Sequence, residues 1–199
     1  LSDLFRYDLQ SGKEKQLTRR MRAFGPDLSP DGSTLLCAVQ KDGTDNLALL
    51  GSDGKHLRDL TAFSNGEGIM GPRWSPDGRH IVFSQARRHG RDLIILDADS
   101  GERTPLVVDD GDARDPWFSA DGQRLYFAWD KSGIFNIYSI RPDGGDLKLW
   151  TNTSGGAFMP SLSAEGELVW SQFQYNGYKI ARLRAPQSLP EEYARYAPA

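Results

Sequence analysis

The sequence has 199 residues, of which 38% are hydrophobic and 26% charged, a composition typical of a folded globular protein. Its 24 Lys and Arg residues nearly balance 27 Asp and Glu residues, so no net field favours binding to nucleic acid or an anionic membrane. No apolar run reaches the roughly 18 residues that span a bilayer, and the single Cys37 excludes an intrachain disulfide.

A fourfold internal repeat runs through the chain, marked by Ser29, Ser75, Ser119 and Ser163. These serines are spaced 46, 44 and 44 residues apart, and each stands before Pro-Asp-Gly, Ala-Asp-Gly or Ala-Glu-Gly. In such a tripeptide proline presets φ, the acidic residue can hydrogen-bond the local backbone and glycine accepts a positive φ. The repeated acidic residues are therefore predicted to form turns rather than to act as catalytic acids.

Each copy of the repeat predicts a set of short strands. An innermost strand precedes the turn, a β-rich run follows it, and after a polar loop comes an aliphatic run. The predicted second strands are 35–39, 81–84, 125–129 and 168–172, and the predicted third strands are 46–50, 92–96, 136–140 and 179–183. In the first three copies a fourth short strand ends near residues 61, 107 and 151. Four short strands in about 44 residues predict a β-propeller blade, with a sandwich or a solenoid as the alternative.

The segment 72–78, Pro-Arg-Trp-Ser-Pro-Asp-Gly, resembles the WD40-like repeat of TolB-type propellers. The resemblance covers about residues 3–184, although Ala120 and Ala164 replace the proline of the signature and Glu165 replaces its Asp. It implies an all-β propeller of four-stranded antiparallel blades and a bacterial periplasmic or cell-surface location. The same repeat occurs in tricorn protease, in prolyl oligopeptidase and dipeptidyl peptidase IV relatives and in some lyases, so the fold does not fix the function.

The repeat also predicts how the chain divides into blades. The expected units are a partial blade 1–18 with third and fourth strands, blades 19–66, 67–111 and 112–155, a blade 156–184 without a fourth strand, and a linker or tail 185–199. Residues 3–9 and 179–183 are both third strands, so the two ends compete for one place and the ring does not close. We expect part of a ring of about six to eight blades, completed by the rest of a longer chain or by a second chain. A small ring with a displaced strand is the alternative.

No set of residues in the sequence predicts catalysis. There is no Gly-x-Ser-x-Gly motif, and the recurring serines belong to the turns, so we expect no catalytic residue and no cofactor. The three histidines, His56, His80 and His89, fall at different levels of their blades and are not expected to share a metal. Asp110 and Asp112 are weak candidates for calcium binding, against a solvated loop in which Arg114 pairs internally.

Loops that join second to third strands, and fourth to first strands, open on the same face of a propeller, here called the loop face. Arginine and aromatic residues dominate contact energies at interfaces, and guanidinium groups bind carboxylates in a bidentate manner. The candidate binding residues on the loop face are Arg87, Arg88, His89, Arg91, Arg114, Lys131, Phe135, Phe158, Tyr175 and Tyr178. The competing interpretation is a set of ordinary polar loops.

These expectations lead to one preferred function and two alternatives. The preferred function is a non-catalytic scaffold that binds a protein or peptide across the loop face and the channel mouth. The first alternative is the substrate-gating propeller of a larger serine peptidase whose catalytic domain lies outside the chain. The second alternative, a metal-dependent lyase, would require a histidine cluster in further blades.

Overall fold

The computed structural model describes residues 2–88 and 90–194, and its strands form five antiparallel sheets. An N-terminal hairpin consists of β1 (Phe5–Tyr7) and β2 (Glu14–Gln16). The first sheet contains β3 (Ala23–Leu28), β4 (Thr34–Lys41), β5 (Thr44–Gly51) and β6 (His56–Asp59), and the second contains β7 (Ile69–Trp74), β8 (His80–Arg87), β9 (Gly90–Asp97) and β10 (Arg103–Val107). The third sheet contains β11 (Ala113–Phe118), β12 (Leu125–Trp129), β13 (Asn136–Ile140) and β14 (Lys148–Leu149), and the fourth contains β15 (Ala157–Leu162), β16 (Leu168–Gln174) and β17 (Gly177–Leu183). A 3-10 helix, η1 (Glu191–Ala194), follows.

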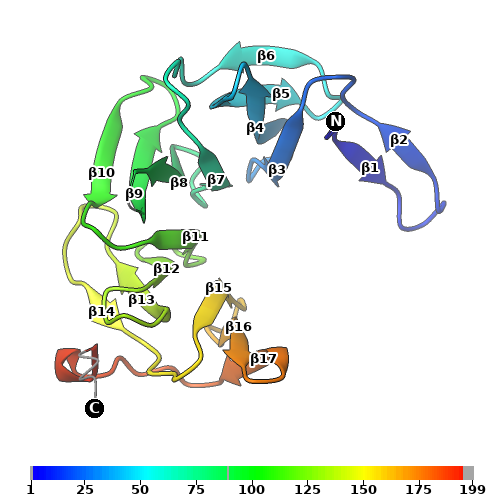
Figure 1. Ribbon diagram of the computed structural model, residues 1–199. Coiled ribbons are helices and arrows are strands. Elements are labelled where there is room, and N and C mark those ends of the chain that lie inside the picture. Colours follow the sequence, from blue (N-terminus) through cyan, green and yellow to red (C-terminus); the bar gives the residue numbers. More distant parts are fainter. Residues whose placement is uncertain (1, 89, 195–199) are drawn as a thin grey trace.

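The sheets stand side by side around an open arc (Figure 1). Strands β3, β7, β11 and β15 lie on the inner side of the arc, and the space that they face is here called the central channel. Within each sheet the strands pair in sequence order, from the innermost to the outermost. The prediction of an all-β propeller with four-stranded antiparallel blades is confirmed.

The repeated turns are held by their own polar side chains. In the second sheet the Ser75 hydroxyl donates to Asp77 Oδ1 at 2.5 Å, and the His80 N–H donates to Ser75 Oγ at 2.9 Å. In the first sheet, hydrogen bonds from Ser29 and Ser33 lower the pKa of the Asp31 carboxyl to about 2. Each carboxylate is therefore an ionised acceptor for the turn at neutral pH, as the tripeptide pattern predicted.

The hydrophobic core lies between neighbouring sheets. One cluster between the first and second sheets includes Leu36 and Phe83, and another between the second and third includes Leu93 and Phe127. All five residues of β13 are buried, whereas most of β17 is exposed and Ile180 on it is 84% accessible. A sheet in this array is therefore buried only where another sheet covers it.

A left-handed residue precedes the repeated proline in each inner strand. The φ angles are 59° at Gly25, 56° at Gly71, 56° at Asp115 and 51° at Met159. The register of each inner strand shifts at this point, as in a β-bulge. Glycine adopts this conformation without strain, whereas Asp115 and Met159 adopt it at a cost.

Replacing Met159 by glycine is expected to raise the free energy of unfolding by about 0.5–1 kcal/mol, because the relief of left-handed strain exceeds the entropy that glycine loses on folding. The Met159 side chain is 67% exposed, so its removal costs little packing. The midpoint of urea unfolding should rise with an unchanged m-value. Met70, 48% exposed and without a positive φ, is the control, and Met70→Gly should destabilise. A lower midpoint for the Met159→Gly protein would contradict the claim that the positive φ of Met159 costs stability.

Inner strands of neighbouring sheets are also hydrogen-bonded through partly buried carboxylates. The Trp74 N–H donates to Asp27 Oδ2 at 2.8 Å, and the Met159 N–H donates to Asp115 Oδ2 at 3.1 Å. Each contact joins a carboxylate of one sheet to the backbone of the next. These bonds fix the lateral position of adjacent inner strands.

A repeated Asn–Thr contact joins two strands of the same sheet. It links the first residue or residues of the third strand to the segment that follows the fourth strand. In the third sheet, Asn136 Oδ1 accepts from the Thr151 hydroxyl at 3.0 Å and from the Thr153 N–H at 2.9 Å. Thr151 Oγ1 in turn accepts from the Ile137 N–H at 2.8 Å. The first sheet repeats the contact with Asn46 and Thr61. Because Asn136 holds Thr151 and Thr153, the first part of the loop between the third and fourth sheets has a defined path.

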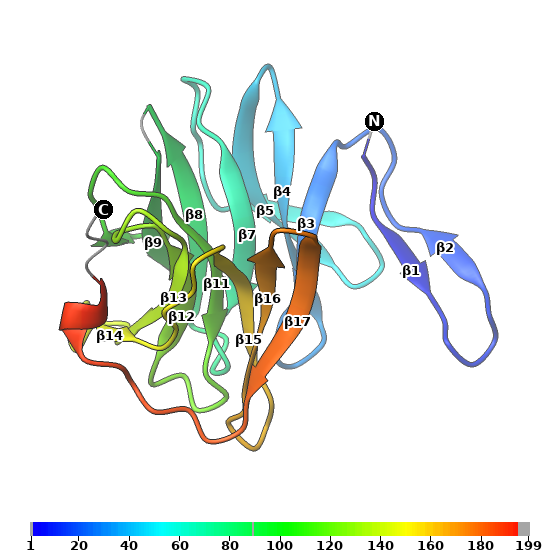
Figure 2. The same ribbon diagram turned by 60° about the horizontal axis from the view of Figure 1, so that its bottom comes forward.

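The chain after β17 turns back toward the preceding sheet. Figure 2 shows it running from the foot of β17 to η1, which lies beside β14. The Leu189 N–H donates to the Leu149 carbonyl at 2.8 Å, and the Leu189 side chain packs on the core between the second and third sheets. Within residues 184–194, the part of this segment that the structure describes, no strand pairs with β17.

Candidate partner-binding surface

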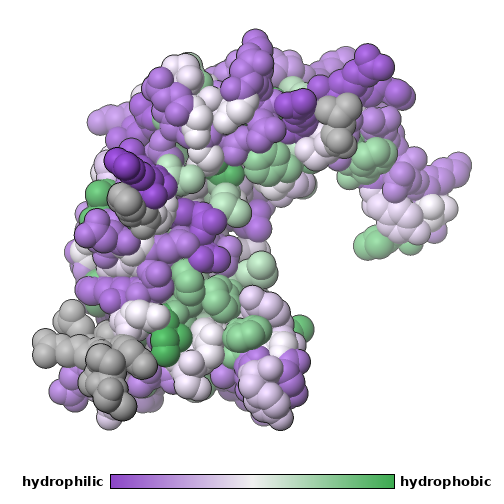
Figure 3. Space-filling model, viewed as in Figure 1, coloured by the Kyte–Doolittle hydropathy of each residue, from purple (hydrophilic) through white to green (hydrophobic). Residues whose placement is uncertain are grey.

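The loop face carries hairpin tips and the loops that enter the inner strands. In Figure 2 this face is at the top, where the β4–β5 and β8–β9 tips project. Figure 3 views the same side of the molecule as Figure 1 and shows apolar surface over the third and fourth sheets in its lower half. The candidate residues from these two sheets are therefore the first to consider as a contact surface.

Arg114, from β11, lies at the centre of this surface. Its guanidinium carbon is 4.0 Å from the centroid of the Phe135 ring and 5.7 Å from that of Phe158. Its Nη2 donates to Asp112 Oδ2 at 2.6 Å. A guanidinium held over aromatic faces and a carboxylate has a fixed orientation, so little rotamer freedom remains to be lost on binding.

The Asp112 carboxylate joins two arginines of different sheets. Arg91 Nη1 lies 2.9 Å from Asp112 Oδ1 and 2.8 Å from Oδ2, and Arg114 binds Oδ2. Gly90 makes this approach possible, since a Cβ atom there would lie 2.2 Å from the Gly111 carbonyl oxygen. The Asp112 carboxylate is thus paired with two guanidinium groups. Among residues 2–88 and 90–194, no cluster of three or more His, Cys, Asp or Glu residues could hold a metal ion.

Aromatic rings extend the surface from Arg114 to the fourth sheet. The ring centroids lie 4.9 Å apart for Phe135 and Phe158, 6.1 Å for Phe158 and Tyr178, and 5.2 Å for Tyr178 and Phe173. Phe173 was not among the residues expected on the loop face; it is the penultimate residue of β16 and pairs directly with Tyr178 of β17. We name the whole set the arginine–aromatic row: Arg91, Asp112, Arg114, Phe135, Phe158, Tyr178 and Phe173.

The other candidates on the loop face make different contacts. Arg87 Nε donates to Asp92 Oδ2 at 2.6 Å, and Lys131 Nζ lies 5.0 Å from the Trp129 ring centroid. Tyr175, at the β16–β17 turn, is 96% exposed, and Arg88 is exposed beside the β8–β9 tip. His89 lies outside the described residues.

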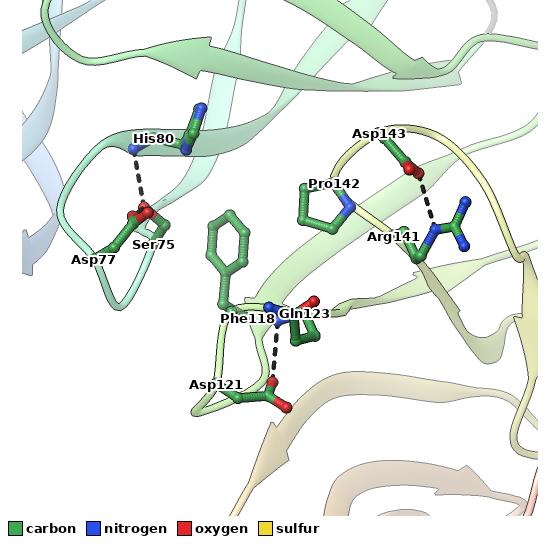
Figure 4. Close-up of a pocket in the computed structure, with 10 residues that line it drawn as sticks. Ser75, Asp77, His80, Phe118, Asp121, Gln123, Arg141, Pro142 and Asp143 are labelled. Atoms are coloured by element: carbon green, nitrogen blue, oxygen red, sulfur yellow. Dashed lines mark hydrogen bonds and ion pairs between the residues drawn. The ribbon is translucent and has the colours of Figure 1, made fainter.

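The two described histidines lie away from this surface. His56 Nε2 is 2.8 Å from Asp59 Oδ1 in β6. His80 lines a pocket of about 340 Å³ at the opposite end of the sheets, between the second and third sheets (Figure 4). Arg141 in the same pocket is already paired with Asp143 at 3.1 Å. The polar groups of this pocket mainly stabilise their own turns.

Asp115 lies directly after Arg114, with its carboxylate partly buried at the boundary between the third and fourth sheets. Burial raises the pKa of this carboxyl above 3.8, and the hydrogen bond from the Met159 N–H and the charge of Arg114 only partly offset that effect. A carboxyl with a raised folded-state pKa is stabilising when protonated and costs stability once it is ionised.

Asp115→Asn is therefore expected to stabilise the protein at neutral pH. The amide oxygen can still accept from the Met159 N–H, and asparagine tolerates the positive φ of this position. The gain should be complete at pH 7 and shrink as the pH falls through the raised pKa toward 3.8, where the aspartate is protonated in both states. Urea unfolding from pH 3 to pH 7 measures the difference, and a gain that grew with falling pH would contradict it.

Comparison with known proteins identifies the family. The TolB beta propeller domain family matches residues 61–189. The chain belongs to this family. The propeller is 29% identical over 147 residues to the uncharacterized protein Atu1656 of Agrobacterium fabrum, covering 71% of this chain and 48% of that protein. It is 30% identical over 167 residues to the TolB homolog of Chlorobium luteolum, covering 78% of this chain and 37% of that protein.

Two further similarities come from a peptidase and a solved structure. The propeller is 26% identical over 165 residues to the uncharacterized peptidase YuxL of Bacillus subtilis, covering 64% of this chain and 25% of that protein. The structure of a TolB from Agrobacterium tumefaciens superposes with a TM-score of 0.81 at 22% identity, covering 92% of this chain and 72% of that one. The propeller thus spans between a quarter and a half of these three curated relatives. In the part of the chain that the structure describes, no helix has the length and apolarity needed to cross a membrane.

Proposed function

We propose that this propeller is a non-catalytic scaffold that binds a protein or peptide partner across the loop face and the channel mouth. The observation that carries the proposal is the arginine–aromatic row, in which two guanidinium groups and four aromatic rings form one continuous series of contacts. Arginine and aromatic side chains supply most of the binding energy at protein interfaces. The row therefore has the composition of an interface centre.

The exposure of the row supports the same function. Tyr178 is 66% and Phe173 39% exposed, whereas the side chains of Arg91 and Arg114 are 23% and 30% exposed. The exposed rings offer apolar area to a partner, and the less exposed guanidiniums are already oriented by Asp112. A rigid, partly apolar surface with a net cation suits a partner segment that has apolar side chains beside a carboxylate.

The row can be tested with a photo-crosslinking amino acid at position 178 of the full-length protein in its host. Tyr193, 52% exposed on η1, provides a matched control position. We expect a discrete adduct from position 178 that disappears when Phe158 is changed to alanine, and none from position 193. Equal labelling from both positions, or no adduct from position 178, would argue against the surface.

The similarity to a Bacillus subtilis peptidase supports a second candidate, a propeller that admits substrate to a serine peptidase domain on the same polypeptide. A fluorophosphonate probe tests it, because it labels an activated serine in the full-length protein. Labelling together with peptide hydrolysis would favour this candidate over the scaffold.

The location proposed for either function is the periplasm or the cell surface of a bacterium. The support is the similarity to the TolB homolog of Chlorobium luteolum. Fractionation of host cells with an antibody to the protein tests this location, and recovery in the cytoplasmic fraction would overturn it.

A further inference from the structure

A cavity of about 400 Å³ lies in the central channel, at the end opposite the loop face. It is lined by residues of the inner strands β3, β7, β11 and β15, so all four larger sheets contribute to it. Each inner strand contributes one of the side chains considered below: Asp27 from β3, Arg73 from β7, Trp117 from β11 and Leu162 from β15. Its size falls within the range of about 300–1,000 Å³ that is usual for small-ligand sites.

Arg73 differs from four of the arginines in the pockets and on the loop face. Arg87, Arg91, Arg114 and Arg141 each form an ion pair with an aspartate. Within the described residues, Arg73 has no carboxylate at ion-pair distance, and its Nη1 donates to the Pro72 carbonyl at 3.2 Å. Most of its N–H donors are therefore available to a ligand carboxylate, the group that a guanidinium fork binds best.

Trp117 gives the cavity a flat apolar wall beside this cation. The Arg73 guanidinium carbon lies 5.5 Å from the centroid of the indole ring, which holds the cation over its face. Both side chains are partly buried, and Leu162 adds apolar surface nearby. A ring in the ligand would stack against the indole while its carboxylate reached Arg73.

Asp27 places an acceptor in the same cavity without neutralising Arg73. Burial raises the pKa of its carboxyl, although the hydrogen bond from the Trp74 N–H and the nearby charge of Arg73 act in the opposite direction. The two charged groups line one cavity and yet form no ion pair with each other. An acceptor held apart from the cation suits a ligand that also carries an N–H group.

We propose that this cavity binds a carboxylate that is joined to a planar ring, with the carboxylate on Arg73 and the ring against Trp117. The ligand is either a small aromatic carboxylate or the C-terminal residue of a peptide that ends in an aromatic side chain. The site is separate from the arginine–aromatic row and does not depend on the proposed partner binding, because it lies at the other end of the channel.

Isothermal titration of the full-length protein tests the site with four probes. These are N-acetylphenylalanine, its amide, and an acetylated tetrapeptide that ends in phenylalanine as the free acid or as the amide. We expect each acid to bind at least about tenfold more tightly than its amide, because only the acid pairs with the guanidinium. Tighter binding of the tetrapeptide acid than of N-acetylphenylalanine assigns the ligand to a peptide terminus, and equal affinities assign it to a free carboxylate.

Variants then locate the binding. Arg73→Gln is expected to abolish the difference between acid and amide, and Trp117→Leu to weaken both acids. Arg79→Gln, in the exposed turn of the same hairpin and outside the cavity, is the control and should leave every affinity unchanged. Phe158→Ala on the loop face should also have no effect, which separates this site from the scaffold function.

Two results would overturn the proposal. One is equal affinity for acid and amide, or no heat of binding with millimolar probe, in the unsubstituted protein. The other is retention of the preference for the acid in Arg73→Gln protein that is folded by circular dichroism. The comparison of acid with amide needs no variant, so the proposal can fail even if the Arg73 substitution prevents folding.

Discussion

Asn136→Ala is expected to lower the free energy of unfolding by about 2–4 kcal/mol, because it leaves buried hydrogen-bond donors without an acceptor. Asn136 is 3% exposed, and its Oδ1 accepts from the Thr151 hydroxyl and the Thr153 N–H. Alanine removes that acceptor where water has little access. The loop between the third and fourth sheets should then lose its fixed path, and Phe158 with it.

The midpoint of urea unfolding measures this loss, with the m-value showing whether two-state behaviour is kept. Asn152, exposed in the same loop, provides the matched control, and Asn152→Ala should change stability by no more than about 0.5 kcal/mol. Equal small effects of the two substitutions would show that the Asn136 contact contributes little.

Arg114→Ala is expected to weaken binding of the partner captured at position 178 by about 30-fold or more, the size of effect seen at the centre of an interface. The substitution removes the cation from the faces of Phe135 and Phe158 and leaves Asp112 with Arg91 alone. Surface plasmon resonance with the purified partner measures the change, which should lie mainly in the dissociation rate.

Arg114→Lys separates charge from shape at the same position. Lysine keeps the positive charge but cannot stack a planar group on the rings, so we expect it to recover only part of the affinity. Arg79→Ala, on the opposite side of the propeller, should leave binding unchanged. Full affinity of the Arg114→Ala protein would remove Arg114 from the interface and would place the binding energy elsewhere.

The parts of the fold that depend on local chemistry could be predicted from the sequence. The Ser-Pro-Asp-Gly segments predict turns because serine, aspartate and glycine act within a few residues of one another, as Ser75 and Asp77 do. The short β-rich and aliphatic runs between these turns predict strands for the same reason. The repeat then places these strands in order, since each sheet pairs its strands consecutively.

The details of the surface depend on contacts between distant residues, and spacing alone does not show them. Arg91 and Asp112 meet because the backbones of Gly90 and Gly111 touch, which neither glycine indicates by itself. Phe173 joins the row because β16 extends beyond residue 172, the end predicted from the sequence, and so pairs Phe173 with Tyr178. The Asn–Thr contact did leave a signal, because both pairs are separated by 15 residues at equivalent repeat positions.

The return of the chain from β17 to β14 determines how the propeller would respond to mechanical load. A pull on the described chain beyond residue 190 would act first on the hydrogen bond between Leu189 and Leu149 and on the packing of the Leu189 side chain. Strand β17 would bear no tension until that attachment failed. The third sheet therefore serves as the anchor for force, and the aromatic rings of the fourth sheet keep their positions while the anchor holds.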